Sequence, residues 1–509
     1  MRMSGMDKVQ IKVNPGNIRL NPDSRHNLLT ALSVHGFFRH LPLCAGIGRC
    51  GNCRIRFVSP PPRPTFKDKE TLTPGELEEG WRLACEHGPE PGQEIDVPSG
   101  RPVFNFSLVS REAPLSLVVD VGTTSVKWAF DHGKGKTSFG SAPNPQSATG
   151  GEVMSRMQFA LDGLERAAAQ KEALSGLIRD ILALVQTAPP LTVLTGNPAM
   201  ICLAFGLDCT TLARAPYSLP LKGNAWYDLG EGLPQVYVPP LVSPFLGADI
   251  VCGLLATGSL EHEKPWLFAD FGTNAEMILG TENGCFGTSV AMGPALEGCG
   301  LRFGAVAGEK GACTQIVMDK NGIYPRGGET CRRLTGTAYL DIVRRLKGLG
   351  IIKESGGFAP DNGSPLAQRV FEQLKENRLY VTEDIFLDPA DIEELLKVKA
   401  AFTLGLEGLL SRAGLKASEL DKIYVAGALG EKLSRGVLIS LGFLPPWSED
   451  KIEFCGNTSL AGGIGMAKDL DASRLQAEEI RKSVHTVDLT RNGLYTGSDF
   501  ARHMRFEFV

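Results

Sequence analysis

The sequence predicts two folds in one chain: a small α+β domain at the N-terminus and a larger α/β domain that contains a repeat. Four cysteines within the first 85 residues indicate the small domain, because three share one loop and the fourth comes later. A strand–turn–strand pattern at residues 117–130 that recurs at residues 267–279 indicates the repeat. An apolar stripe at helical spacing near residue 400 predicts a long helix, which is typical of an α/β domain.

The composition is that of an ordinary globular protein and excludes several classes of function. Of 509 residues, 43% are hydrophobic and 22% are charged, and the net charge is −4. A nucleic-acid-binding protein would need a basic face, so we expect no nucleic-acid partner. The N-terminus lacks the apolar segment of a signal peptide, and no apolar run approaches the ~18 residues of a membrane span. We therefore expect a cytoplasmic protein without a membrane partner, and its scattered single cysteines fit reduced thiols.

Cys44, Cys50, Cys53 and Cys85 are spaced like the ligands of an iron–sulfur cluster. The first three follow the pattern C-x5-C-x2-C, and the fourth comes 31 residues later. Plant-type ferredoxins hold a [2Fe–2S] cluster with four thiolates in the similar arrangement C-x4-C-x2-C…C. Glycines between the cysteines allow the backbone angles that a loop around a cluster needs. Structural zinc usually shows two separated cysteine pairs, and a Rieske centre needs two histidines, so both alternatives fit less well.

The cysteine-bearing domain is expected to occupy residues 1–98. Prolines and weak periodicity then mark residues 99–114 as a linker. The elements expected in the domain are strands within Val9–Leu20, a helix at Leu28–His35, a strand at Arg54–Val58 and a short helix within Leu72–Gly80.

The rest of the chain repeats a strand that ends in Asp-x-Gly-Thr. The first copy is Leu117–Ser125 and the second is Leu267–Ala275, and another strand-like run follows each copy. A third strand, Lys422–Ala426, ends in a further glycine, Gly427. Glycine at such strand ends predicts tight turns.

A long helix is expected to begin after Asp388 and to end at Gly414. Asp388 is a suitable N-cap, Pro389 suits the first helical position, and Gly414 suits the C-terminal end. Apolar residues recur between these ends at helical spacing, so one face of the helix is expected to lie in the core.

An Asp-x-Gly-Thr turn can bind a polyphosphate. Its amides and its threonine hydroxyl can point at phosphate oxygens, and glycine allows a close approach. Asp120 and Asp270 could hold Mg²⁺ through water and position an attacking water, so we predict that they are catalytic. Glu276 and Glu297 near the second turn could orient water or metal, or could be merely structural. The residues expected to bind the nucleotide are Gly122, Thr123, Thr124, Ser125, Gly272, Thr273, Asn274 and Gly427.

These motifs resemble those of the actin and sugar-kinase superfamily. Its two phosphate loops match Asp120–Ser125 and Asp270–Asn274, and its adenosine motif matches Val425–Ala428, with Ala428 in place of a second glycine. Joined to an N-terminal [2Fe–2S] domain, the chain resembles the ATP-dependent reductive activators of corrinoid proteins. It departs from longer members in lacking their extra domain after the cluster domain, and a glycine-rich turn near Arg333–Thr337 is degraded. Other stretches that agree with this family include Asn144–Gln146, Gly151–Arg156, Thr195–Pro198, Gly247–Ile250 and Gly293–Gly298.

The resemblance implies a β-grasp ferredoxin-like domain followed by a duplicated, ribonuclease-H-like, two-lobed ATPase domain, with lobe I at residues 115–262 and lobe II at residues 263–509. It implies a [2Fe–2S] cluster, ATP and Mg²⁺ as cofactors. The implied reaction is ATP-dependent one-electron reduction of the inactive cob(II)alamin of a corrinoid protein to cob(I)alamin, which reactivates a corrinoid-dependent methyltransferase system. The implied partners are that corrinoid protein and an upstream reductase, and a homodimer is a further expectation.

Two other functions are compatible with the same residues. One is a small-molecule kinase with a redox-sensing cluster, which would need a site for an acceptor hydroxyl. The other is a non-catalytic module that binds nucleotide and gates electron flow without turnover.

Overall fold

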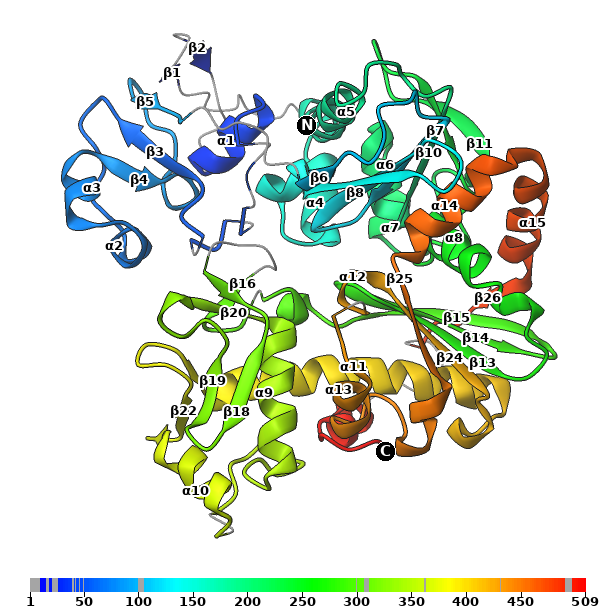
Figure 1. Ribbon diagram of the computed structural model, residues 1–509. Helices are drawn as coiled ribbons and strands as arrows, with labels where there is room; N and C mark the ends of the chain where they lie inside the picture. Colours follow the sequence, from blue (N-terminus) through cyan, green and yellow to red (C-terminus); the bar gives the residue numbers. More distant parts are fainter. Residues whose placement is uncertain are drawn as a thin grey trace. The chain divides into compact units, whose positions relative to one another are not determined.

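The computed structural model divides into two compact units, Met1–Asp249 with Gly463–Arg474, and Ile250–Gly462 with Leu475–Val509 (Figure 1). The sequence prediction placed the boundary between the two ATPase lobes after residue 262. In the structure the chain passes between the two compact units within α8 (Ala248–Thr257), α14 (Thr458–Lys468) and α15 (Leu470–Ser483). The structure describes residues 10–14, 18–20, 26–38, 41, 43–44, 46–48, 50–98, 105–298, 300–305, 311–360, 363–430, 432–489 and 497–509.

The N-terminal domain in the first unit is a five-stranded mixed sheet with a helix and its own core. The strand order is β2-β1-β5-β3-β4, with β1 parallel to β5 and the other pairs antiparallel. Leu28 and Leu32 of the helix α1 are buried with Val13, Ile55 and Ile95 of the sheet. This arrangement agrees with the expected β-grasp domain. The elements are β1 (Ile11–Asn14), β2 (Ile18–Leu20), α1 (Leu28–Val34), β3 (Arg54–Phe57), α2 (Phe66–Thr71), α3 (Pro74–Glu78), β4 (Trp81–Leu83) and β5 (Glu94–Asp96).

The first unit also contains a seven-stranded sheet in the order β11-β12-β10-β7-β8-β9-β6. Strand β7 is parallel to β10 on one side and antiparallel to β8 on the other. Residues of α5 and α6 are buried with residues of β7 and β8 in one core cluster. The elements are β6 (Asn105–Ser107), β7 (Ser116–Val121), β8 (Ser125–Asp131), β9 (Thr137–Pro143), α4 (Val153–Leu161), α5 (Leu164–Leu182), β10 (Leu191–Gly196), α6 (Pro198–Phe205), α7 (Thr210–Ala213), β11 (Ala225–Asp228) and β12 (Gln235–Val238).

The six-stranded sheet of the second unit repeats this topology. Its order is β25-β24-β13-β14-β15-β26, and β13 is parallel to β24 and antiparallel to β14. The run β12-β10-β7-β8-β9 therefore corresponds strand for strand to β25-β24-β13-β14-β15. The repeat predicted from the two Asp-x-Gly-Thr turns and the duplicated ribonuclease-H-like fold are confirmed. The strands are β13 (Trp266–Phe271), β14 (Asn274–Thr281), β15 (Gly284–Ala291), β24 (Lys422–Ala426), β25 (Ile452–Gly456) and β26 (Val484–Thr486).

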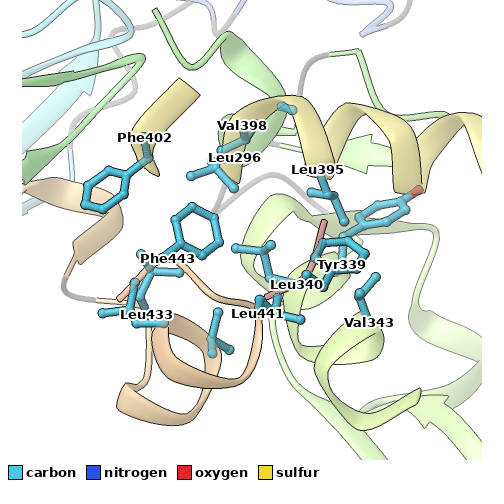
Figure 2. Packing of buried hydrophobic residues seen from close by; sticks show 14 of the residues in the cluster. Leu296, Tyr339, Leu340, Val343, Leu395, Val398, Phe402, Leu433, Leu441 and Phe443 are labelled. Carbon is cyan, nitrogen blue, oxygen red and sulfur yellow. The ribbon is translucent and has the colours of Figure 1, made fainter. Parts of the chain in front are cut away.

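The long helix α11 (Pro389–Ala413) organises the core of the second unit. Asp388 caps it with a reciprocal capping box, and Gly414 ends it in the left-handed conformation at φ +69°, so the predicted ends are confirmed. The helix, yellow in Figure 1, lies against β14 and β15. Figure 2 shows Phe402 of α11 close to Phe443, and their ring centroids are 5.7 Å apart.

The remaining elements of the second unit surround this core. Shorter sheets and helices lie between β15 and α11 along the chain, and further helices follow β24 and β26. They are β16 (Gly304–Ala305), β17 (Ala312–Cys313), β18 (Ile316–Asp319), β19 (Gly322–Pro325), β20 (Arg333–Thr335), α9 (Gly336–Gly348), α10 (Pro365–Glu372), β21 (Leu374–Lys375), β22 (Arg378–Tyr380), β23 (Phe386–Leu387), α12 (Gly427–Gly430), α13 (Arg435–Ser440), α15 (Leu470–Ser483, which begins in the first unit) and α16 (Gly497–His503).

Part of the expected linker belongs to the seven-stranded sheet. β6 pairs antiparallel with β9 and forms an edge of the sheet. Phe106 of this strand packs against Trp128 and Phe130, with ring centroids 6.5 and 6.2 Å apart. A strand of three residues is too short to show an alternating pattern, so its residues alone do not predict it. Residues 99–104 of the expected linker lie outside the described residues.

Within the part of the chain that the structure describes, no helix combines the length and the apolar character needed to cross a membrane.

Candidate functional site

The four cysteines of the N-terminal domain lie as two neighbouring pairs. Cys53 precedes β3 and Cys85 lies in the 3₁₀ helix η1 (Ala84–Glu86); both are buried, and their sulfur atoms are 3.4 Å apart. Cys44 and Cys50 lie on the preceding loop and are half-buried. A hydrogen bond with Cys44 is the largest cause of the raised pKa of Cys50, so these two thiols are also neighbours.

Electrostatic interactions connect the two pairs of thiols. A hydrogen bond with Cys53 raises the pKa of Cys85, and the same bond lowers the pKa of Cys53. The charge of Cys44 also acts on Cys53 and on Cys85. Two pairs of thiolates suit a binuclear centre, in which each metal takes two of them.

Glycines shape the loop around the cysteines as the sequence predicted. Gly46, Gly48 and Gly51 have φ angles of +82°, +77° and +68°, which other residues rarely adopt. A Cβ atom on Gly48 would also lie 2.9 Å from the Glu86 carboxylate, beside Cys85. The positive φ angles of these three residues are therefore what require glycine in the loop.

A buried hydrogen bond between Asp68 and His87 holds the chain on both sides of Cys85. Asp68 accepts hydrogen bonds from the Leu83 amide at 2.8 Å and from Nε2 of His87 at 2.7 Å. Burial alone would raise the pKa of Asp68, but hydrogen bonds from His87, Leu83 and Thr65 outweigh it and lower that pKa. His87 thus fixes the ligand segment by hydrogen bonding.

The first Asp-x-Gly-Thr turn joins β7 to β8, and two asparagines hold it. Asn144 donates from its side chain to the Gly122 carbonyl at 2.8 Å and from its main chain to the Thr124 carbonyl at 2.9 Å. Asn197, the N-cap of α6, donates to the Thr123 hydroxyl at 3.3 Å. A Cβ atom on Gly122 would lie 2.6 Å from the Ser125 carbonyl, so this turn requires glycine.

The second Asp-x-Gly-Thr turn joins β13 to β14 in the other unit. The Gly272 amide donates to the Asn274 carbonyl at 2.9 Å and closes the turn. The Thr273 hydroxyl donates to Oε1 of Glu297 at 2.9 Å. Asp270 pairs in register with Glu276, which accepts a hydrogen bond from Ser289 at 3.0 Å.

Gly427 lies directly against the second turn. Its φ is +90°, and a Cβ atom here would lie 2.3 Å from a carboxylate oxygen of Asp270 and 2.6 Å from the Phe271 carbonyl. The predicted contact of Gly427 with the nucleotide stays a prediction, and its neighbours within the protein are Asp270 and Phe271. Gly427 therefore limits where the Asp270 side chain can lie.

Sequence reasoning missed the roles of Asn144 and Asn197. Both stand in stretches that agree with the family, but an asparagine beside proline usually indicates a turn or a helix cap. Both are indeed caps, Asn144 of the 3₁₀ helix η2 (Pro145–Thr149) and Asn197 of α6. Their second function, holding the first turn, depends on contacts across 22 and 74 residues.

Comparison with known proteins supports one family over most of the chain. Residues 115–262 match the model described as the RACo middle region, and residues 264–506 match the C-terminal domain of RACo, the ASKHA domain. A corrinoid activation enzyme of Eubacterium limosum is 29% identical over 74% of this chain and 67% of its own length. A reductase of the Co(II) methylated-amine-specific corrinoid protein of Methanosarcina barkeri is 28% identical over 48% of this chain and 46% of its own length.

One solved structure extends the likeness over nearly the whole chain. The reductive activator for corrinoid, iron–sulfur protein superposes with a TM-score of 0.64 and 21% identity, covering 98% of this chain and 97% of its own. At that identity the likeness concerns the fold, including the N-terminal domain that precedes the two matched regions. Because two consecutive regions of one family account for residues 115–262 and 264–506, the chain belongs to the RACo family of corrinoid activators.

Proposed function

We infer that this protein uses ATP to drive single electrons onto the cobalt of a partner corrinoid protein, converting inactive cob(II)alamin to cob(I)alamin. The observation that carries this inference is the presence in one chain of a four-thiol site and two phosphate-type turns in duplicated lobes. The relatives named for corrinoid activation and for reduction of a Co(II) corrinoid protein support the same reaction.

The four cysteines are the proposed ligands of a [2Fe–2S] cluster. Thiolates are the ligands that such clusters take, and the two thiol pairs fit two irons. When bound, the cluster supplies one-electron transfer. The protein's own contribution is the buried Asp68–His87 pair and the glycine loop, which hold Cys85 and Cys53 together.

The two turns are the proposed binding sites for the phosphates and Mg²⁺ of ATP. Gly122 to Ser125 would supply amides and hydroxyl groups in the first turn, and Gly272 to Asn274 would supply amides in the second. Asp120 and Asp270 are both half-buried, so their carboxylates can reach bound Mg²⁺ and an attacking water. Gly427 would keep Asp270 in position, as its close approach to that carboxylate indicates.

Coupling to ATP has a simple energetic reason. A plant-type cluster has a potential near −400 mV, and the corrinoid couple is expected to be lower. Each 59 mV that one electron must move uphill lowers the equilibrium constant of the transfer about tenfold, which corresponds to about 1.4 kcal/mol. Binding and hydrolysis of ATP can shift the population toward the state that passes the electron, provided that the nucleotide binds that state better.

The partners that this chemistry needs are a corrinoid protein and an upstream reductase. We place both in the cytoplasm with this protein, and we include a homodimer in the proposal. Light scattering after size-exclusion chromatography tests the homodimer without any partner.

Metal content and ATPase activity test the two halves separately. Protein purified without oxygen should contain two irons and two sulfides per chain and give a rhombic S = 1/2 signal when reduced. Cys85→Ser should abolish that signal and leave ATP hydrolysis intact, because the N-terminal domain has its own core. Asp120→Ala and Asp270→Ala should each lower ATP hydrolysis about a hundredfold and leave the cluster intact. Zinc in place of iron, or phosphorylation of a metabolite, would reject the proposed function.

A further inference from the structure

The two equivalent threonines of the repeated turns take part in hydrogen bonds of opposite direction. Thr123 accepts a hydrogen bond from the Asn197 side chain, so its own proton is left for another acceptor. Thr273 instead donates to Glu297. An ionised carboxylate can only accept, so the single proton of the Thr273 hydroxyl is used in that bond. What Thr273 can offer to a ligand is therefore the lone pairs of its oxygen.

Glu297 is held firmly beside Thr273. It ends the 3₁₀ helix η4 (Pro294–Glu297), and its neighbour Leu296 is buried in the core shown in Figure 2. A Cβ atom on Gly298, whose φ is +84°, would lie 2.3 Å from the Ala305 carbonyl. A Cβ atom on Gly336 would lie 2.3 Å from the Leu296 carbonyl. Both sides of η4 are therefore packed closely enough to require glycine, and the Glu297 main chain has little freedom.

The Glu297 carboxylate and the Thr273 oxygen together suit a cation and not a phosphate. The Thr273 proton is used in the bond to Glu297, so the oxygen can only accept from or coordinate a ligand. Phosphate oxygens are acceptors, so they need a donor, and Thr273 has no second proton to give. The negative charge of Glu297 also repels a polyphosphate unless a cation lies between them. Mg²⁺ prefers oxygen ligands and usually keeps several of its waters, which such a pair can accept or replace.

We propose that Thr273 and Glu297 form a magnesium-binding pair, whereas Thr123 binds phosphate directly. Glu297 accepts the hydrogen bond of the Thr273 hydroxyl, which would leave the lone pairs of the Thr273 oxygen for Mg²⁺ or for one of its waters. The two turns are alike in sequence and strand topology, but the threonine of the first contacts a phosphate and the threonine of the second, with Glu297, contacts the metal ion. This proposal rests on the proposed binding of Mg-ATP and assigns the second turn a more specific task.

Binding measurements with and without metal separate the two roles. Mn²⁺ replaces Mg²⁺ in electron-spin titrations with a non-hydrolysable ATP analogue, and metal-free binding of the same analogue is measured by calorimetry in EDTA. Thr273→Val and Glu297→Gln should each weaken Mn²⁺ binding about tenfold to a hundredfold, as loss of an outer metal contact does. Neither should weaken metal-free binding, and Glu297→Gln should tighten it because a repelling charge is removed.

Thr123→Val should show the opposite pattern. It should weaken metal-free binding of the ATP analogue about tenfold, since a hydrogen bond to a charged phosphate is lost. The affinity for Mn²⁺ in the presence of saturating analogue should stay within about threefold of the wild-type value. The double variant Thr273→Val with Glu297→Gln should lose little more Mn²⁺ affinity than either single variant, because the two side chains act as a unit.

Matched controls come from the other end of the same strand. Thr281 donates to the Gly284 carbonyl at 2.9 Å, and Glu282 is exposed in the following turn. Thr281→Val and Glu282→Gln should leave both binding constants unchanged. Weaker metal-free binding in Thr273→Val, with unchanged Mn²⁺ affinity, would overturn the pair while leaving the proposed function intact. A wild-type protein that binds no nucleotide would overturn both.

Discussion

Replacing Gly427 with alanine should displace Asp270, because the structure has no room for the added methyl group. The new Cβ atom would lie 2.3 Å from the Asp270 carboxylate, whereas ordinary contact begins at 3.4 Å, so the carboxylate must move by about 1 Å. The φ of +90° adds a strain of about 1–2 kcal/mol for a residue with a side chain. A displacement of about 1 Å at a reacting centre can cost about a hundredfold in rate.

The assay for Gly427→Ala is ATP hydrolysis together with thermal unfolding. We expect hydrolysis to fall about a hundredfold and the free energy of unfolding of the second unit to fall by about 2 kcal/mol. Gly348→Ala is the matched control, because Gly348 ends α9 and has no atom within 4 Å of the added Cβ position. That variant should keep wild-type hydrolysis and stability. Wild-type hydrolysis in Gly427→Ala would show that this glycine does not position Asp270.

Two further predictions concern the first turn and the C-terminal segment. Asn144→Ala removes the donor to the Gly122 carbonyl, so ATP hydrolysis should fall more than tenfold and the free energy of unfolding should fall by about 1–2 kcal/mol. Unchanged hydrolysis would show that the first turn keeps its conformation without Asn144. Lys399 is fully buried and donates to the carbonyls of His503 and Glu507, and burial lowers its pKa to about 8. The unfolded chain then holds this proton more tightly, so the free energy of unfolding should rise by up to about 3 kcal/mol between pH 8 and pH 10.5. Denaturant titrations at several pH values should show that the free energy of unfolding rises less with pH in Lys399→Met than in the wild type. The same rise in both proteins would show that Lys399 does not cause it.

The features that the sequence predicted well are those that neighbouring residues determine. The ends of α11 follow from Asp388, Pro389 and Gly414, which act within one turn of the helix. The two Asp-x-Gly-Thr turns follow from local glycine chemistry. The repeated order of strands in both units follows from repetition of that local pattern.

The features that sequence reasoning missed depend on residues far apart in the chain. Gly427 meets Asp270 only because β24 pairs with β13, and nothing near either residue indicates that contact. Asn144 reaches the first turn through its position at the end of β9. The edge strand at Asn105–Ser107 is stabilised by β9, and its own sequence carries no strand pattern.

The hydrogen-bond partner of Thr273 shows a subtler limit of sequence reasoning. Its resemblance to Thr123 predicted the same contact with phosphate for both residues. The direction of a hydroxyl hydrogen bond depends on the partner, which is Asn197 for one threonine and Glu297 for the other. Two turns of the same sequence can therefore differ in chemistry when the residues that hydrogen-bond to them differ.

The most direct test of the account is ATP-dependent formation of cob(I)alamin. The protein, reduced with a weak donor, is mixed with its cognate corrinoid protein in the cob(II)alamin state, and the visible spectrum is followed with and without Mg-ATP. We predict conversion to cob(I)alamin only with Mg-ATP. We also predict no conversion by Cys53→Ser, which lacks the cluster, or by Asp270→Ala, which keeps it. An equal yield of cob(I)alamin without ATP, or wild-type yield from Asp270→Ala, would contradict the coupling of ATP hydrolysis to electron transfer.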